Sequence, residues 1–450
     1  MTGPTRDVFM LELEKRGLLD PNEDGKLDEY ARISTNPLTW GSALVGPDGV
    51  KQFFAPSMRL NRPNFTGLRS LFAATQGLAN DASGYTYSEA IALESHFDAI
   101  QIGIANDRTT GTITCGPVKV STPAVYGDGN NSAGTWANVT FSGSPTVVLP
   151  NATDAADPTV TFSDWIPISS VARTDIAGGF PLLFVRSLMP ASTTTFPVAF
   201  TGVTSTAWAT KSDGRIWGSH RQIGDQVSTP SGFNVVTETS AHIVYAVRFR
   251  SRGKVVTVAG FGDSNMAGSN AGGATLYGDG FLTRAGAALS SATRPVSIGN
   301  FGWGGQTSAQ FIKRAERLIP LIQPDIAVYT GFTPNDGTPS AASNNLARQN
   351  VARFIAVCQA NNVVPVLVNG LPSSGSGYTS PQDAFRKTYN AELAAYPGTL
   401  VVDVSTAVGD GAAPENFRAG LSSDQVHGND SANTLASVPL ATAVASVFGV

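Results

Sequence analysis

The chain has 450 residues, of which 42% are hydrophobic and 14% are charged, and its formal net charge is -4. This length is sufficient for two or three domains with sizeable cores, and the charged fraction is well below the roughly 25% of an average globular protein. Because there is no run of basic residues, the sequence offers no electrostatic basis for binding nucleic acid or an anionic membrane. No apolar run reaches the length of a transmembrane helix.

Residues 1–44 are expected to form a short helical segment followed by an acidic turn. This turn has oxygen-bearing residues at the first, third, fifth and ninth positions of a calcium loop and a glycine at the sixth; these four residues are Asp20, Asn22, Asp24 and Asp28. The twelfth position is Ala31, where a bidentate acid normally closes the site. Both a structural calcium site and a simple acidic turn remain open interpretations.

Residues 45–250 are rich in Thr, Ser, Val, Gly and Pro. Short β-branched or alternating runs, such as 96–104 and 242–247, are separated by turn-rich stretches such as 126–131. This pattern is typical of antiparallel strands. We therefore expect a β-sandwich accessory domain, with a jelly-roll topology that hides the strand edges.

From residue 251 to residue 450 the pattern changes, and apolar strand-like runs alternate with amphipathic helices. The predicted strands are 255–260, 296–300, 326–330, 363–369 and 400–404. The predicted helices are 281–289, 309–321, 346–360, 383–395 and 435–448. Five such units predict a flavodoxin-like, doubly wound parallel sheet of the α/β class. Functional residues of such sheets lie beyond the carboxyl ends of the strands.

A serine, a histidine and an aspartate at this edge have the chemistry of a hydrolytic triad. Ser264 follows the first predicted strand and opens a helix, and His427 is the only histidine after His242. Serine needs a base to remove its proton at neutral pH, so a nucleophilic Ser264 requires His427. Asp424 precedes this histidine by three positions, or one helical turn, and can orient its ring.

Two further segments at the same edge carry donors for a developing oxyanion. The Gly-rich stretch 302–307 offers unhindered backbone N–H groups, and Asn335 offers a side-chain amide. Trp303 is the only tryptophan of the α/β region. It is a candidate wall for a sugar or acyl group, although an aromatic residue in this position can equally well pack the loop.

The order Gly-Asp-Ser, Gly, Asn-Asp and Asp-x-x-His resembles the SGNH (GDSL-type) hydrolase family over residues 251–450. The resemblance implies that Ser264, His427 and Asp424 form the catalytic triad. It also implies an oxyanion hole made by the backbone N–H groups of Ser264 and Gly305 and the side chain of Asn335. One departure is Thr333, which stands where the family usually has glycine in its Gly-x-Asn-Asp block.

The resemblance implies ester hydrolysis that requires no cofactor. A β-sandwich beside the catalytic domain and the low charge favour a carbohydrate O-acetylesterase, whose partner is an acetylated glycan or polysaccharide rather than nucleic acid or a membrane. The N-terminus has no basic segment followed by an apolar one, so no signal peptide is expected. We expect an extracellular or virion-associated enzyme, such as a phage tail component, and a cytoplasmic location stays open. The protein could also form a homo-oligomer.

Two alternative functions remain open at this stage. The first is a general carboxylesterase, lipase or thioesterase, which would need an apolar slot for its acyl chain. The Gly- and Ser-rich loop 373–377 instead favours a polar substrate. The second is a non-catalytic virion protein or adhesin with a decayed hydrolase domain. The complete set of motif residues argues against decay.

Overall fold

A computed structural model describes part of the chain. The described residues are 44–45, 51–52, 66–70, 73–79, 82–93, 97–106, 108–122, 132, 136–154, 156–167, 182–192, 195–200, 209–210, 216–229, 241–251, 255–269, 280–291, 294–396 and 399–447. The predicted N-terminal helix and the candidate calcium ligands Asp20, Asn22, Asp24 and Asp28 lie outside them. None of the described helices combines the length and the apolar character that crossing a membrane requires.

The C-terminal region contains the predicted five-stranded parallel sheet. Its strand order is β20-β19-β21-β22-β23, and every neighbouring pair is parallel. This order is that of the flavodoxin-like doubly wound fold, which confirms the predicted fold class. The strands are β19 (Val256–Phe261), β20 (Val296–Asn300), β21 (Ile326–Thr330), β22 (Val364–Val368) and β23 (Leu400–Val402).

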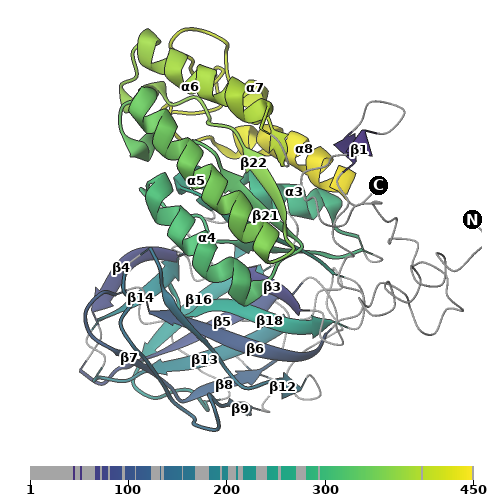
Figure 1. The fold of residues 1–450 in the computed structure, drawn as a ribbon. Coiled ribbons are helices and arrows are strands. Elements are labelled where there is room, and N and C mark those ends of the chain that lie inside the picture. The colour runs from purple at the N-terminus through teal and green to yellow at the C-terminus, as the bar shows by residue number, and fades with distance from the viewer. Residues whose placement is uncertain are drawn as a thin grey trace, which may run out of the picture.

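Helices cover both faces of this sheet (Figure 1). Side chains alternate along β21: Ile326 and Val328 belong to one apolar cluster, and Ala327 and Tyr329 belong to another. The first cluster includes residues of α3 (Phe281–Leu289), α7 (Ser405–Val408) and α8 (Asp430–Val447). The second includes residues of α4 (Ser308–Ile322), α5 (Ala341–Ala360) and α6 (Ser380–Ala394).

Local sequence determines where several of these helices begin. Before α4, the backbone N–H of Thr307 donates to Oε1 of Gln310 at 2.9 Å. Before α5, Oγ of Ser340 accepts a hydrogen bond from the backbone N–H of Ser343 at 3.2 Å. Such reciprocal contacts between residues three apart satisfy N–H groups that have no partner within the helix.

The N-terminal region is composed mostly of antiparallel strands. These are β1 (Leu44–Val45), β2 (Lys51–Gln52), β3 (Thr66–Ser70), β4 (Ala73–Ala79), β5 (Tyr85–Ala92), β6 (Phe97–Asn106), β7 (Ile113–Cys115), β8 (Val118–Ser121), β9 (Ala137–Val139), β10 (Val147–Leu149), β11 (Thr159–Phe162), β12 (Ile166–Pro167), β13 (Leu182–Met189), β14 (Thr195–Phe200), β15 (Ala209–Thr210), β16 (Ile216–Ile223), β17 (Ala241–His242) and β18 (Val244–Ser251). The region is therefore β-rich, as predicted. The jelly-roll topology stays a prediction.

A single apolar cluster joins two sheets of this region. One sheet has the order β15-β16-β5-β13-β8-β9, and it contributes Ile91, Leu183 and Val120. The strands β6 and β18 belong to another sheet and contribute side chains such as Ile102 and Phe249. Residues of both sheets therefore belong to one apolar core, and the predicted β-sandwich stays a proposal.

The sheet that contains β6 and β18 continues into the parallel sheet of the C-terminal region. Its order is β11-β6-β18-β3-β20-β19-β21-β22-β23, and β3 pairs with β20 at Ser70 and Gly299. Tyr245 of β18 lies in the same apolar cluster as the helix α4, and its ring centroid is 5.9 Å from that of Phe301. The expected boundary between residues 250 and 251 thus falls at the end of β18. This strand contributes side chains to the apolar cores of both regions. The division into domains stays a proposal.

Candidate active site

Ser264 lies at the sharp turn between β19 and the short helix α2 (Ser264–Ala267). The turn requires glycine because a Cβ atom on Gly262 would lie 2.2 Å from Oγ1 of Thr330. Asp263 caps α2 by accepting a hydrogen bond from the backbone N–H of Asn265 at 2.9 Å. Ser264 is thereby held at the carboxyl end of the sheet, where 8% of its surface is exposed.

His427 and Asp424 reach this serine from the loop between α7 and α8. Nε2 of His427 lies 2.9 Å from Oγ of Ser264, and Nδ1 lies 2.7 Å from Oδ2 of Asp424. When Nδ1 carries a proton and donates it to the carboxylate, Nε2 is the nitrogen that can accept the serine proton. The structure thus brings a serine hydroxyl, an imidazole and a carboxylate into one series of hydrogen bonds, which is the arrangement that activation of a serine requires.

Backbone groups hold Asp424 in its charged form. Its Oδ1 accepts hydrogen bonds from the backbone N–H groups of Val426 and His427, each at 2.8 Å. Burial opposes the charged form, but the hydrogen bonds from His427 and Val426 outweigh it and lower the pKa of Asp424 to about 2. The expected helical turn between Asp424 and His427 is wrong: Gln425 has a φ of 57°, and the aspartate side chain closes the turn.

Two of the predicted oxyanion donors lie on the loops after β20 and β21. A Cβ atom on Gly304 would lie 3.9 Å from Cβ of Ser264, so this loop passes beside the nucleophile. Gly305 has a φ of 76°, a conformation that favours glycine. Asn335 donates from Nδ2 to the backbone carbonyl of Gln306 at 2.9 Å. The same nitrogen carries a second hydrogen that can be donated to an oxyanion.

Trp303 has little surface to offer a substrate. Only 5% of it is exposed, and the guanidinium carbon of Arg314 lies 4.4 Å from the centre of its ring. Its backbone N–H donates to the carbonyl of Gly262 at 3.0 Å. These contacts favour the packing role that the sequence left open over the role of a substrate wall.

Asn300, the last residue of β20, supports the site through contacts that the sequence did not reveal. Its Oδ1 accepts the backbone N–H of Gly302 at 3.0 Å, and its Nδ2 donates to the carbonyl of Met266 at 2.8 Å. Asn300 therefore fixes the loop after β20 against the helix that carries Ser264.

Gly375 is a second residue that sequence reasoning missed. A Cβ atom on Gly375 would lie 1.9 Å from the carbonyl oxygen of Asp424, and its N–H donates to the carbonyl of Gln425. The loop that contains η3 (Ser374–Ser376) therefore packs directly against the loop that carries Asp424 and His427. A glycine in a Ser- and Gly-rich loop carries no sequence signal for such a contact.

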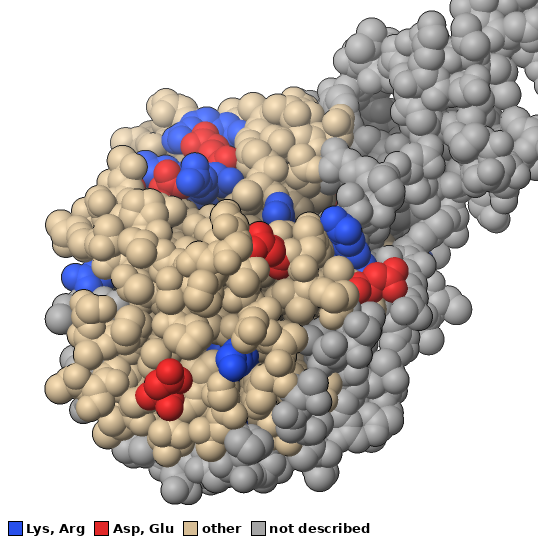
Figure 2. Space-filling model, turned by 90° about the horizontal axis from the view of Figure 1, so that it is seen from below, with Lys and Arg blue, Asp and Glu red and all other residues tan. Residues whose placement is uncertain are grey.

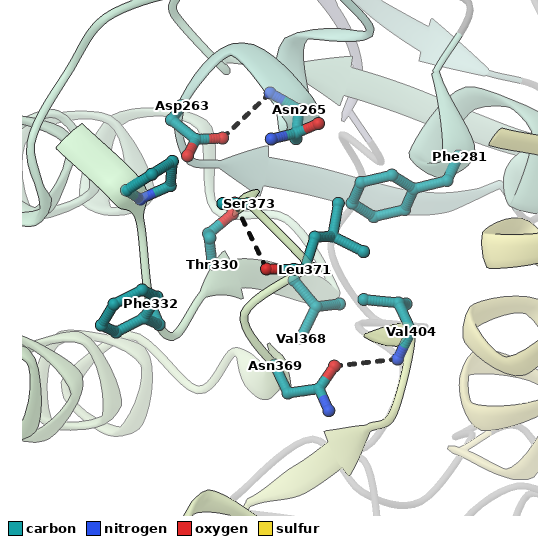
Figure 3. Close-up of a pocket in the computed structure, with 11 residues that line it drawn as sticks. Asp263, Asn265, Phe281, Thr330, Phe332, Val368, Asn369, Leu371, Ser373 and Val404 are labelled. Carbon is teal, nitrogen blue, oxygen red and sulfur yellow. Dashed lines mark hydrogen bonds between the residues drawn. The ribbon is translucent and has the colours of Figure 1, made fainter. Parts of the chain in front are cut away.

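A small cavity lies between the nucleophile turn and the loops after β21 and β22 (Figure 3). Its volume is about 10 Å³, which is room for about one water molecule. Asp263 and Asn265 contribute polar groups to the lining, but most of the cavity wall is apolar. The apolar lining residues include Phe281, Phe332, Val368, Leu371 and Val404.

Comparisons with known proteins were made for the whole chain. Residues 261–435 match the family described as GDSL-like Lipase/Acylhydrolase. A search of curated proteins finds no match.

Three solved structures are among those that the chain matches. A lipase/acylhydrolase from Enterococcus faecalis is 19% identical, with 42% of this chain and 95% of that one covered and a TM-score of 0.33. A variant of an acetyl-xylooligosaccharide esterase from Geobacillus is 18% identical, with 44% and 96% covered and a TM-score of 0.33. A family 3 carbohydrate esterase from Clostridium thermocellum is 14% identical, with 44% and 98% covered and a TM-score of 0.33. On the family match, residues 261–435 of this chain form a GDSL-like lipase/acylhydrolase domain, which is the SGNH hydrolase fold that the motifs predicted.

Proposed function

We propose that this protein is a serine esterase that removes O-acetyl groups from a carbohydrate or polysaccharide. The observation that carries the proposal is the unbroken series Ser264 Oγ, His427 Nε2, His427 Nδ1 and Asp424 Oδ2, with distances of 2.9 and 2.7 Å. Acyl transfer from an ester needs these groups in this order. The family match supports the coarser assignment of an acyl hydrolase.

The reaction proceeds in two acyl-transfer steps. Ser264 Oγ attacks the ester carbonyl carbon while Nε2 of His427 takes its proton, and Asp424 stabilises the histidinium ion. The N–H groups of Ser264 and Gly305 and the amide of Asn335 hold the oxyanion. His427 then returns the proton to the departing sugar oxygen. A water molecule, deprotonated by the same histidine, then attacks the acyl carbon; the bond to Ser264 Oγ breaks, acetate leaves, and His427 returns the proton to the serine.

The space beside the nucleophile turn supports a short acyl group. The cavity there has a volume of about 10 Å³, and its lining includes Asp263 and Asn265, the two neighbours of Ser264. A long acyl chain that entered this cavity would have to displace its walls, so an acetyl group fits it better.

One described face of the molecule supports an uncharged partner. Figure 2 shows one face of the molecule, on which the described surface carries few charged side chains and lysine, arginine and acidic residues lie near one another. A glycan can bind such a surface through hydroxyl groups, whereas nucleic acid needs a basic patch.

Acetate release across a panel of acetylated polysaccharides tests this proposal. We expect release from at least one polymer and covalent labelling of Ser264 by a fluorophosphonate. Labelling of the protein without acetate release from any polymer would contradict the carbohydrate assignment and leave the esterase assignment standing. Failure of both would contradict the esterase assignment.

A general carboxylesterase is the second candidate, and the apolar cavity lining favours it. Phe281, Phe332 and Leu371 could move apart to accept a longer acyl chain. A series of p-nitrophenyl esters from acetyl to octanoyl separates the candidates. The carbohydrate esterase should lose kcat/KM steeply beyond acetyl, and the carboxylesterase should keep or raise it.

A further inference from the structure

Thr333 lies between the nucleophile turn and the oxyanion donor. It precedes the short helix η2 (Pro334–Asp336) and is 0% exposed. Its Oγ1 donates a hydrogen bond to Oδ2 of Asp263 at 2.6 Å. The same oxygen accepts the backbone N–H of Asn335 at 3.2 Å. The hydroxyl group therefore contacts both residues at once.

Asp263 extends this contact to the start of α2. Its Oδ1 accepts the backbone N–H of Asn265 at 2.9 Å, and only 1% of the residue is exposed. The buried series thus runs from Asn265, through the Asp263 carboxylate and the Thr333 hydroxyl, to the backbone of Asn335. Ser264 lies between Asp263 and Asn265 in the chain. The series of hydrogen bonds therefore links the segment that carries the nucleophile to the segment that carries the oxyanion donor.

The hydrogen-bonding groups in this series have few alternatives. Burial raises the pKa of Asp263, and the hydrogen bond from Thr333 opposes this rise. Without the hydroxyl group, Oδ2 of Asp263 and the N–H of Asn335 would each lose a buried partner. Leaving a buried polar group unpaired is unfavourable, so the loop would shift to find new partners.

The backbone at Thr333 does not require glycine. Its φ is -131° and its ψ is 140°, which is ordinary extended backbone for any residue. The usual family glycine at this position is therefore replaced here without strain, and the replacement adds a hydroxyl group that glycine lacks.

We propose that Thr333 is a positioning residue that aligns the Asn335 amide with Ser264 through Asp263. This proposal rests on the proposed esterase function. Thr333 itself does not touch the substrate. Its hydroxyl group fixes where the Asn335 donor stands, and the benefit of that alignment is greatest when negative charge develops on the oxyanion.

The test compares Thr333→Val, which removes the hydroxyl group, with Thr333→Ser, which keeps it. With p-nitrophenyl acetate, the valine variant should lose about 10- to 100-fold in kcat while KM stays within about two-fold, because misplacement of a group in a catalytic site affects mainly the transition state. The serine variant should keep most of the wild-type kcat. Equal activity of the valine and wild-type proteins, or equal losses in both variants, would overturn the proposal.

A double variant shows whether Thr333 acts through Asn335. If it does, Thr333→Val should reduce kcat by less than about two-fold when Asn335 is already alanine, because residues that act as a unit are not additive. A full additional loss in the double variant would mean that Thr333 acts by another route.

Thr257 provides a matched control in the same sheet. Its Oγ1 donates to Oδ2 of buried Asp325 at 2.9 Å, and Thr257 lies near the start of β19, whereas Ser264 follows its end. Thr257→Val should lower the melting temperature and leave kcat unchanged. If wild-type protein hydrolyses the ester and Ser264→Ala does not, the esterase function stands whatever the Thr333 variants show.

Discussion

The parallel and antiparallel regions share one sheet, but their strands differ in how completely their residues are buried. Every residue of β19, β20, β21 and β22 is buried, whereas β6 includes exposed and half-buried positions. Helices cover both faces of the parallel strands, and all their carboxyl ends meet at one edge. Neighbouring antiparallel strands run in opposite directions, so their loops divide between two edges. The difference explains why Ser264, Gly305 and Asn335 converge in the parallel region.

The two regions also depend on each other for packing. Tyr245 of β18 packs among residues of the parallel region, and Arg248 donates to the backbone carbonyl of Leu321 at the end of α4. On the other face of the same strand, Phe249 belongs to the antiparallel core. One strand therefore contributes to both cores, and we expect the described regions to unfold together.

The largest expected effect on kcat comes from replacing Ser264, and Ser163 of the antiparallel region serves as its structural control. Ser264→Ala should reduce kcat for an activated acetyl ester by about 10⁴- to 10⁶-fold, and His427→Ala nearly as much, because triad members act as a unit. Steady-state kinetics of folded variants measure this. In the antiparallel region, Ser163→Ala removes an acceptor for the backbone N–H of Ile102 and should lower only the melting temperature. Retained activity in Ser264→Ala would contradict the proposed mechanism.

Replacing Asn335 should give the next largest effect on kcat, and Asn106 of the antiparallel region serves as its control. Asn335→Ala should lower kcat by about 10²- to 10³-fold with little change in KM, because the amide acts mainly on the developing charge. Asn106 in the antiparallel region donates to the backbone carbonyl of Pro150 at 2.9 Å. Asn106→Ala should destabilise the fold and leave kcat unchanged. A change in KM alone for Asn335→Ala would show that this residue binds the ground state.

The shared strand β18 allows a test of cooperative unfolding. Tyr245→Ala and Phe249→Ala should each lower the free energy of unfolding by about 3 kcal/mol, because each removes a buried ring. Circular dichroism and residual hydrolysis, followed against temperature, should change together in both variants. If Phe249→Ala melted in two steps, with hydrolysis surviving the first, the regions would be independent and the sheet would not couple them.

Gly375 connects the loop after β22 with the triad loop. Gly375→Ala would place a Cβ atom 1.9 Å from the carbonyl oxygen of Asp424, so the acid of the triad must move. We expect kcat to fall by about 10²-fold, the typical result of a small misplacement in a catalytic site. Gly377 has a φ of 79° and open space around it, so Gly377→Ala should add backbone strain and change kcat little. Equal kcat values for the two variants would contradict the predicted contact.

The smallest effect concerns ion pairs between the two regions. Lys313 of α4 lies 2.5 Å from Asp154, and both side chains are more than a third exposed. Lys313→Ala should change the free energy of unfolding by less than about 1 kcal/mol, and less still at high salt. Chemical denaturation at two salt concentrations measures this. A larger loss would mean that charge, rather than the shared apolar core, holds the regions together.

The sequence alone was sufficient for most of the parallel region. The predicted strands 296–300 and 326–330 have the observed bounds, as does the helix 281–289. These strands are buried on both faces, and such strands contain apolar runs that are easy to recognise, as residues 326–329 show. The motifs alone also indicated Ser264, Asp424 and His427, and the structure places them within hydrogen-bonding distance. Their catalytic roles stay proposals.

Only the tertiary structure revealed how the segments meet. The contact between β3 and β20, the hydrogen bond from Thr333 to Asp263 and the packing of Gly375 against Asp424 join residues far apart in the chain. Periodicity reports which face of a strand or helix is buried, because that depends on residues a few positions apart. It does not report which loop lies against which, because that depends on the order of strands in the sheet and on close contacts between atoms. The candidate site residues could therefore be named from the sequence, but the contacts that position them could not.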